Sequence, residues 1–169
     1  MLANQIGYYS LILGLLLSFI LCAVSIKDFN NSNKRISQNI FILSFLQLTF
    51  VVVSFLSLIL SFIKSDFSNE TVFNNSHTTK PLFYKISGTW GNHEGSLLLW
   101  LLVLTLFIFL FLTKSKEQPK KYRILTLLFQ QLIIIGFFLF VLMTSNPFNY
   151  LFPIPVEGLG LNPILQDPA

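Results

Sequence analysis

The chain has 169 residues, of which 53% are hydrophobic, 15% aromatic and only 11% charged, with a formal net charge of +4. Average soluble domains carry about 25% charged residues and disordered chains are poor in apolar ones, so this composition excludes both classes. The single cysteine, Cys22, excludes a disulfide scaffold and a thiolate zinc site, which leaves a polytopic membrane protein.

Four apolar stretches without charged residues are long enough to cross a bilayer as helices, which takes about 18 or more residues. The predicted spans are residues 6–26, 39–63, 96–113 and 124–145. They predict an all-α polytopic membrane protein with about four transmembrane helices in residues 1–145. A loop at 64–95 and a proline-rich segment at 146–169 complete the predicted organisation.

The basic residues predict the orientation of these spans. Of the 11 Lys and Arg residues, only Lys64, Lys80 and Lys85 lie outside the regions that follow the first and third spans. Because basic loops stay on the inner side, we expect both termini on the outer side, which is the periplasm or the mitochondrial intermembrane space. The positive charge therefore reflects topology, and we expect no nucleic-acid partner.

The predicted spans contain few polar residues and no Asp, Glu, Lys, Arg or His. Proton pumps and ion carriers place ionisable groups inside the membrane, so a self-contained transporter is not supported. Gln47, Gln130 and Gln131 are expected to form hydrogen bonds to neighbouring helices, with a ligand role as the less favoured alternative.

The string LFYKISGTWGNHEGSLLLW, Leu82 to Trp100, holds the strongest candidates for a binding site. Glycines at this density allow close backbone approach, and a tryptophan at the membrane interface can stack on a flat ring. The alternative is an ordinary interfacial helix start with an aromatic anchor. The candidate binding residues are Trp90, Gly91, Asn92, His93, Glu94, Gly95, Ser96 and Trp100.

Three of these residues also suit the start of the third span. Asn92 or Ser96 can cap its N-terminus, and the carboxylate of Glu94 suits the positive end of the helix dipole. His93 adjoins that end, where a neutral imidazole is favoured. His77 lies in an Asn/Ser/Thr-rich stretch and is expected to be solvated. No hydrolase or metal-binding pattern is present, so we predict no catalytic and no metal-ligating residue.

The segment 146–169 holds five of the seven prolines and is predicted to be an ordered, extended loop along the membrane surface. It contains many apolar residues in a region that we expect to be exposed to water. Exposed apolar surface of this kind marks a contact, so we expect a partner to cover it.

The string SGTWGNHEGSLLLW, Ser87 to Trp100, resembles the corresponding string of the CcmF family of cytochrome c-type biogenesis proteins, the haem lyase subunit. SDFSNETVFNNSH, Ser65 to His77, looks like that family's first outer loop. GLNPILQDPA, Gly160 to Ala169, looks like its proline-rich outer segment. The order and spacing of the four spans agree, and the resemblance covers nearly the whole chain.

The resemblance implies a part in attaching haem to apocytochrome c on the outer face of the membrane, with this chain as the N-terminal portion and one wall of the site. The family's tryptophan-rich segment and its haem-ligating histidines are absent, and neither His77 nor His93 is assigned that role. The implied cofactor is haem, bound mainly elsewhere. The implied partners are a companion chain with the tryptophan-rich segment and the ligating histidines, a haem carrier, apocytochrome c and the lipid membrane.

The amino-acid composition suggests the kind of genome that encodes the chain. Phe, Ile, Asn, Lys, Tyr and Met, which have A/T-rich codons, number 64, against 20 for Gly, Pro, Ala and Arg. This favours an A+T-rich genome and the mitochondrial inner membrane, with a bacterial inner membrane as the alternative. The competing functional hypothesis is a structural transmembrane subunit of a larger respiratory complex without chemistry of its own.

Overall fold

The computed structural model describes residues 2–31 and 35–160, which form six helices. Residues 161–169 of the predicted proline-rich segment, with most of the GLNPILQDPA string, lie outside the described residues. The helices are α1 (Leu2–Phe29), α2 (Gln38–Ile63), α3 (Glu70–Asn75), α4 (Leu82–Gly88), α5 (His93–Lys114) and α6 (Lys120–Met143).

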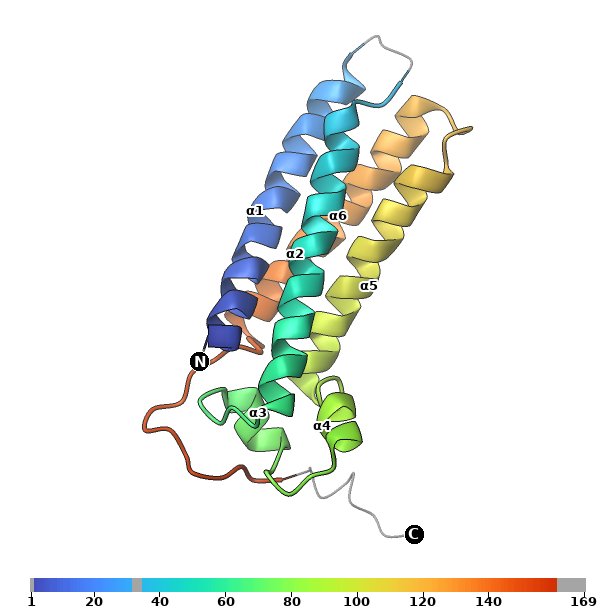
Figure 1. Ribbon diagram of the computed structural model, residues 1–169. Coiled ribbons are helices and arrows are strands. Elements are labelled where there is room, and N and C mark those ends of the chain that lie inside the picture. The colour runs from blue at the N-terminus through green and yellow to red at the C-terminus, as the bar shows by residue number, and fades with distance from the viewer. Residues whose placement is uncertain (1, 32–34, 161–169) are drawn as a thin grey trace.

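The long helices α1, α2, α5 and α6 are each apolar and long enough to cross a membrane. They form a bundle in which α1 packs on α2, α2 on α5, α5 on α6 and α6 back on α1 (Figure 1). Within the part of the chain that the structure describes there is no β-strand, only one isolated bridge. The predicted all-helical class with four membrane-spanning helices is confirmed.

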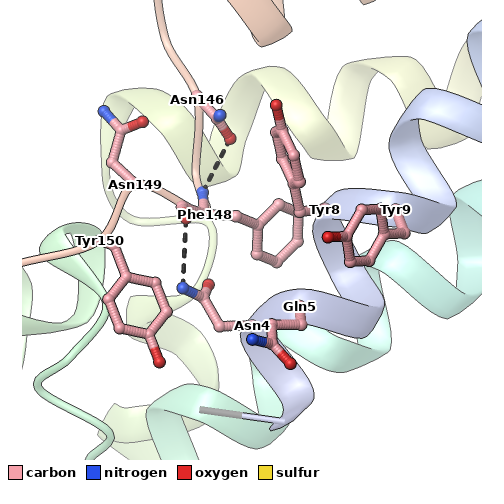
Figure 2. Close-up of a pocket in the computed structure, with 8 residues that line it drawn as sticks. All are labelled: Asn4, Gln5, Tyr8, Tyr9, Asn146, Phe148, Asn149 and Tyr150. Carbon is pink, nitrogen blue, oxygen red and sulfur yellow. Dashed lines mark hydrogen bonds between the residues drawn. The ribbon is translucent and has the colours of Figure 1, made fainter.

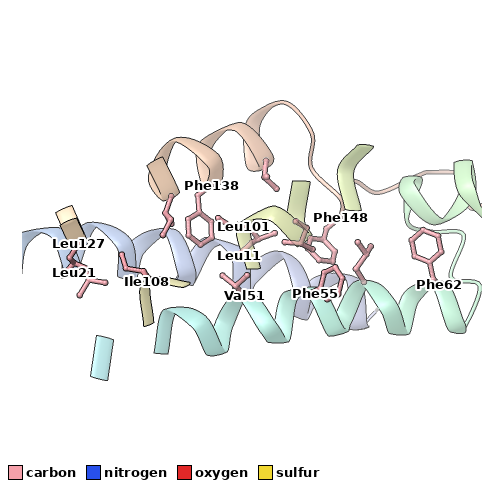
Figure 3. Close-up of a cluster of buried hydrophobic side chains, with 14 of the residues drawn as sticks. Leu11, Leu21, Val51, Phe55, Phe62, Leu101, Ile108, Leu127, Phe138 and Phe148 are labelled. Carbon is pink, nitrogen blue, oxygen red and sulfur yellow. The ribbon is translucent and has the colours of Figure 1, made fainter. Parts of the chain in front are cut away.

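The core of the bundle is built from large apolar side chains of all four long helices (Figure 3). Leu11, Val51, Leu101 and Phe138 are all fully shielded from solvent. The buried side of α1 also carries small residues, which let neighbouring backbones approach closely where lipid gives no hydrophobic drive to helix association. These small residues are Gly7, Ser10, Gly14, Ser18 and Ser25.

A polar contact sits inside this apolar core. The side chains of Gln47 on α2 and Gln131 on α6 exchange amide hydrogen bonds of 3.2 and 3.0 Å. Gln47 also donates to the Ser18 hydroxyl at 2.6 Å. All three residues are fully buried. The expectation that glutamines join neighbouring helices is confirmed for this pair, whereas the buried Gln130 carbonyl oxygen has no partner among the described residues.

The four long helices extend beyond the predicted apolar spans and include charged residues at their ends. Charged side chains at the end of α1 and the start of α6 form an ion pair. Lys120 Nζ lies 3.2 Å from Asp28 Oδ1, and both side chains are nearly buried. Asp28 also accepts a hydrogen bond from the Ser37 N–H at 3.1 Å. Arg123 donates to the Leu112 carbonyl oxygen at the end of α5. These contacts close the basic end of the bundle.

The opposite end carries α3 and α4, both formed within the predicted loop 64–95 (Figure 1). The first residues of α1, the start of α5 and the segment after α6 lie at this same end. We call it the α3/α4 end. Its two short helices were not predicted, because neither is long enough to form a hydrophobic span.

Candidate functional site

The start of α5 is held by the side chain of Asn92. Its carbonyl oxygen accepts the Gly95 N–H at 2.7 Å, which is the standard cap for a free helix N-terminus. Its amide group donates to the carbonyl oxygens of Gly88 at 2.8 Å and Thr89 at 3.2 Å. Asn92 therefore joins the end of α4 to the start of α5, and its polar atoms are already engaged within the chain.

Gly95 is needed for the same turn. A Cβ atom at this position would overlap the backbone carbonyl oxygen of Thr89. Gly95 is itself buried. This glycine lets one part of the chain approach another, so the structure places it in the scaffold beneath the predicted site and not on its surface.

Residues between Trp90 and Ser96 surround an open depression of about 550 Å³. Trp90 is 42% exposed at its edge. The ring of His93 and the carboxylate of Glu94 come from the first turn of α5, and Asn74 and Asn75 come from the end of α3. The depression is lined by Asn74, Asn75, Trp90, Gly91, Asn92, His93, Glu94 and Ser96.

Trp100 lies outside this lining, although it shares a helix face with it. Seven residues are nearly two full turns of an α-helix, so Trp100 follows His93 on one face about 10 Å further along α5. Trp100 is 59% exposed. The structure thus brings six of the eight candidates to one depression, places Gly95 beneath it and places Trp100 on the adjoining surface of α5.

His77 lies elsewhere at the α3/α4 end. Its Nδ1 is 2.9 Å from the Thr79 hydroxyl, and its Nε2 is 3.8 Å from Glu157 Oε1. Glu157 accepts hydrogen bonds from the Thr78 hydroxyl at 2.5 Å and the Thr78 N–H at 2.9 Å. The Thr78 hydroxyl bond, followed by the backbone N–H bonds of Thr78 and Gly158, lowers the pKa of Glu157 to about 2.

A buried asparagine holds this end together. Asn69 caps α3 by accepting the Val72 N–H at 3.1 Å. Its amide group donates to Asn4 Oδ1 at 2.6 Å and to the Pro147 carbonyl oxygen at 2.8 Å. Asn4 in turn donates to the Phe148 carbonyl oxygen at 3.2 Å (Figure 2). Three segments far apart in the sequence therefore meet at Asn69.

Beside this contact lies a pocket of about 290 Å³ (Figure 2). It is lined by Asn4, Gln5, Tyr8, Tyr9, Asn146, Phe148, Asn149 and Tyr150. In residues 2–31 and 35–160 no group of three His, Cys, Asp or Glu side chains is arranged to hold a metal ion.

Two asparagines of the α3 region contribute to the α3/α4 end without having been predicted from the sequence. Neither Asn69 nor Asn74 was among the predicted site residues, yet Asn69 is fully buried and Asn74 lines the depression. One local signal was available for Asn69, because an asparagine directly before an acidic residue is typical of a helix N-cap. No local signal indicated that Asn74 would face His93, since that proximity depends on how α3 sits beside α5.

Comparison with known proteins identifies the family to which this chain belongs. Residues 90–169 match the family described as Cytochrome C assembly protein. The chain is 40% identical over 166 residues to the cytochrome c-type biogenesis protein CycK of Rhizobium meliloti, an alignment that covers 96% of this chain and 24% of CycK. It is 35% identical over 166 residues to the cytochrome c-type biogenesis protein CcmF of Escherichia coli, covering 98% and 26%.

A solved structure of the cytochrome c haem lyase CcmF shares the fold, with a TM-score of 0.76 at 24% identity over 87% of this chain and 25% of that one. The chain thus spans about a quarter of the length of these relatives. The four long apolar helices and the relatives agree on an integral membrane protein. The resemblance noted in the sequence is confirmed: the chain belongs to the CcmF family of cytochrome c-type biogenesis proteins.

Proposed function

We propose that this chain is the N-terminal portion of a membrane haem lyase and forms one wall of the site where haem is attached to apocytochrome c. The observation that carries the proposal is the open depression at the start of α5, where Trp90, His93 and Glu94 gather on a backbone fixed by Asn92 and Gly95. Attachment depends on holding two thiols beside the haem, which is a matter of positioning.

The lining of the depression fits the edge of a haem better than its iron. Trp90 offers an exposed aromatic ring for stacking, and the His93 ring offers a hydrogen-bond donor for a propionate. The N-terminus of α5 also favours a negative group. Glu94 is an acceptor, which suits the N–H groups of an apocytochrome segment. When bound, haem supplies the vinyl groups that join the apocytochrome thiols.

Both histidines of the chain are accounted for. His77 faces Thr79 and Glu157, so His93 is the imidazole that lines the depression. A pair of axial ligands within this site therefore needs residues from elsewhere. We assign them to a companion chain that also carries the tryptophan-rich segment, with a haem carrier delivering the cofactor. We also propose, from the distribution of basic residues, that both termini face the outer side of the mitochondrial inner membrane, or of a bacterial inner membrane as the alternative.

The test is the combined substitution Trp90→Ala, His93→Ala and Glu94→Ala in the native membrane. Covalent haem on c-type cytochromes, measured by haem staining after denaturing electrophoresis, should fall by roughly tenfold or more, since misplaced reacting groups cost on the order of 10²-fold. The level of the assembled membrane complex should stay normal.

The matched control is Phe83→Ala, another strongly exposed aromatic at the α3/α4 end that does not line the depression. It should leave maturation unchanged. Normal maturation in the triple variant would instead support the competing hypothesis of a structural subunit in a larger respiratory complex.

A further inference from the structure

We propose that the segment after α6 presents a preformed apolar docking surface, centred on Phe152, Val156 and Leu159, for the part of the CcmF-type protein that lies outside these 169 residues. The inference deepens the proposed function, on which it rests, by assigning the face through which the companion chain is recognised. It is carried by a contrast within one segment between a backbone hydrogen-bonded at both ends and strongly exposed apolar side chains.

The backbone of the segment is hydrogen-bonded to the α3 region at both of its ends. The Leu151 N–H donates to the Ser68 carbonyl oxygen at 2.9 Å. The Leu159 N–H donates to the Phe73 carbonyl oxygen at 2.8 Å, and the Gly160 N–H donates to the Ser76 carbonyl oxygen at 3.1 Å. Residues 151–160 therefore follow the surface of α3 instead of moving freely.

Two further contacts fix the far end. At Gly158 the backbone approaches so closely that a Cβ atom would overlap the Ser76 carbonyl oxygen and the Phe67 ring. The neighbouring Glu157 carboxylate accepts both the hydroxyl and the N–H of Thr78. The segment cannot turn its apolar side chains inward without breaking these contacts.

The apolar side chains point away from the chain. Phe152 is 94% exposed, Val156 97% and Leu159 71%. Phe148, earlier in the same segment, is only 4% exposed because it packs into the core. Exposed apolar side chains on a hydrogen-bonded backbone mark a contact surface, because no other residue in 2–31 or 35–160 covers them.

The position of the segment favours a protein over lipid as the occupant. Its later part runs along the side of α3 that faces away from the four long helices (Figure 1). We expect lipid chains around the four long helices, whose length and apolar composition suit a bilayer, and not on this side of α3. The relatives CycK and CcmF are about four times as long as the present chain, which covers 24% to 26% of them. Most of the family protein therefore lies outside these residues and is available to cover the surface.

The test uses the chain in its native membrane with Phe152→Ser and Val156→Ser combined. After mild solubilisation, we measure by mass spectrometry the recovery of peptides that match the other three quarters of the relatives. Recovery with the tagged chain should fall by roughly tenfold, because loss of central apolar anchors dominates interface energetics. Met143→Ser, which alters an 81% exposed apolar residue at the end of α6, is the matched control and should leave recovery unchanged. Equal recovery in both variants, or equal loss, would overturn the proposal.

A photo-crosslinking amino acid in place of Val156 identifies the occupant directly. An adduct to a polypeptide matching the rest of the family supports the proposal, whereas adducts to lipid or to a second copy of this chain overturn it. Unchanged hydrogen-exchange protection at the Leu159 amide shows that the double variant still folds, and Val156→Ser alone is the milder second variant.

The two proposals fail separately. If the Trp90, His93 and Glu94 variant still co-purifies with the rest of the family protein but no longer supports cytochrome c maturation, both the proposed site and the docking surface are supported. Normal maturation in that variant removes the proposed site and leaves the docking surface standing. Lost recovery in the Phe152 and Val156 variant with the depression intact keeps the docking surface whatever the fate of the site.

Discussion

At the scale of single residues, the turn between α4 and α5 depends on two side-chain choices. Asn92 uses its carbonyl oxygen and its amide group on three backbone partners, and Gly95 leaves room for the Thr89 carbonyl. Both residues were predicted to bind a ligand. Their contacts within the chain also hold Trp90 and His93 around the depression, and Asn92 itself is part of its lining.

We expect Asn92→Ala to cost about 1 kcal/mol of local stability, the usual cost of losing a helix N-cap. Asn92→Asp keeps an acceptor for the Gly95 N–H but sets an acceptor-only oxygen against the carbonyl oxygens of Gly88 and Thr89, so it should also weaken the turn. Hydrogen exchange at the Gly95 amide in lipid nanodiscs is the measurement. Wild-type protection in the alanine variant would show that the cap does not hold the turn.

At the scale of helices, packing in the bundle combines a close-fitting apolar core with one buried amide pair. Gln47 and Gln131 satisfy each other across the bundle, and Ser18 takes the remaining contact. In the bilayer core no water is available to hydrogen-bond an unpaired amide. Only the alignment of α2 and α6 that pairs the two glutamines satisfies both side chains, so the pair specifies that alignment. An apolar face alone leaves that alignment open.

Gln47→Leu should lower the free energy of unfolding by about 1–3 kcal/mol, because Gln131 is left buried without its partner. The double variant with Gln131→Leu should lose less than the sum of the two single variants, since both polar groups are then removed. The measurement is unfolding by denaturing detergent in mixed micelles. Thr49→Val, which affects an exposed side chain bonded within α2, is the control and should be near neutral. Strict additivity would contradict the pairing.

At the scale of the whole molecule, polar contacts close the bundle at both ends. Asp28 and Lys120 join α1 to α6 at the basic end. Asn69 joins α1, α3 and the segment after α6 at the other end. The Glu157 contact extends this closure along the segment, so its strength depends on the charge of one carboxylate.

Glu157 should make the attachment of residues 157–160 sensitive to acid. Its pKa is lowered from 4.5 to about 2 by the hydrogen bonds of Thr78 and Gly158. The stabilisation is therefore complete above a pH of about 4.5, declines as the pH falls, and is lost below about 2. Protection of the Leu159 amide, normalised to its intrinsic exchange rate, should decrease across this window. Glu157→Gln should be weaker at neutral pH and flat across the window, and the same pH dependence in that variant would exclude Glu157 as its source.

The sequence by itself determined the membrane class, the four long helices and the family, because these depend on apolar length and on a specific string around Trp90. It also located the region of the depression, since Trp90, His93 and Glu94 are close in the chain. Only the tertiary structure decided that Asn74 joins the lining, that Asn69 ties α1 and the segment after α6 to α3, and that the apolar residues after α6 stay exposed. Each of these depends on contacts between segments distant in sequence, which no local pattern of residues encodes.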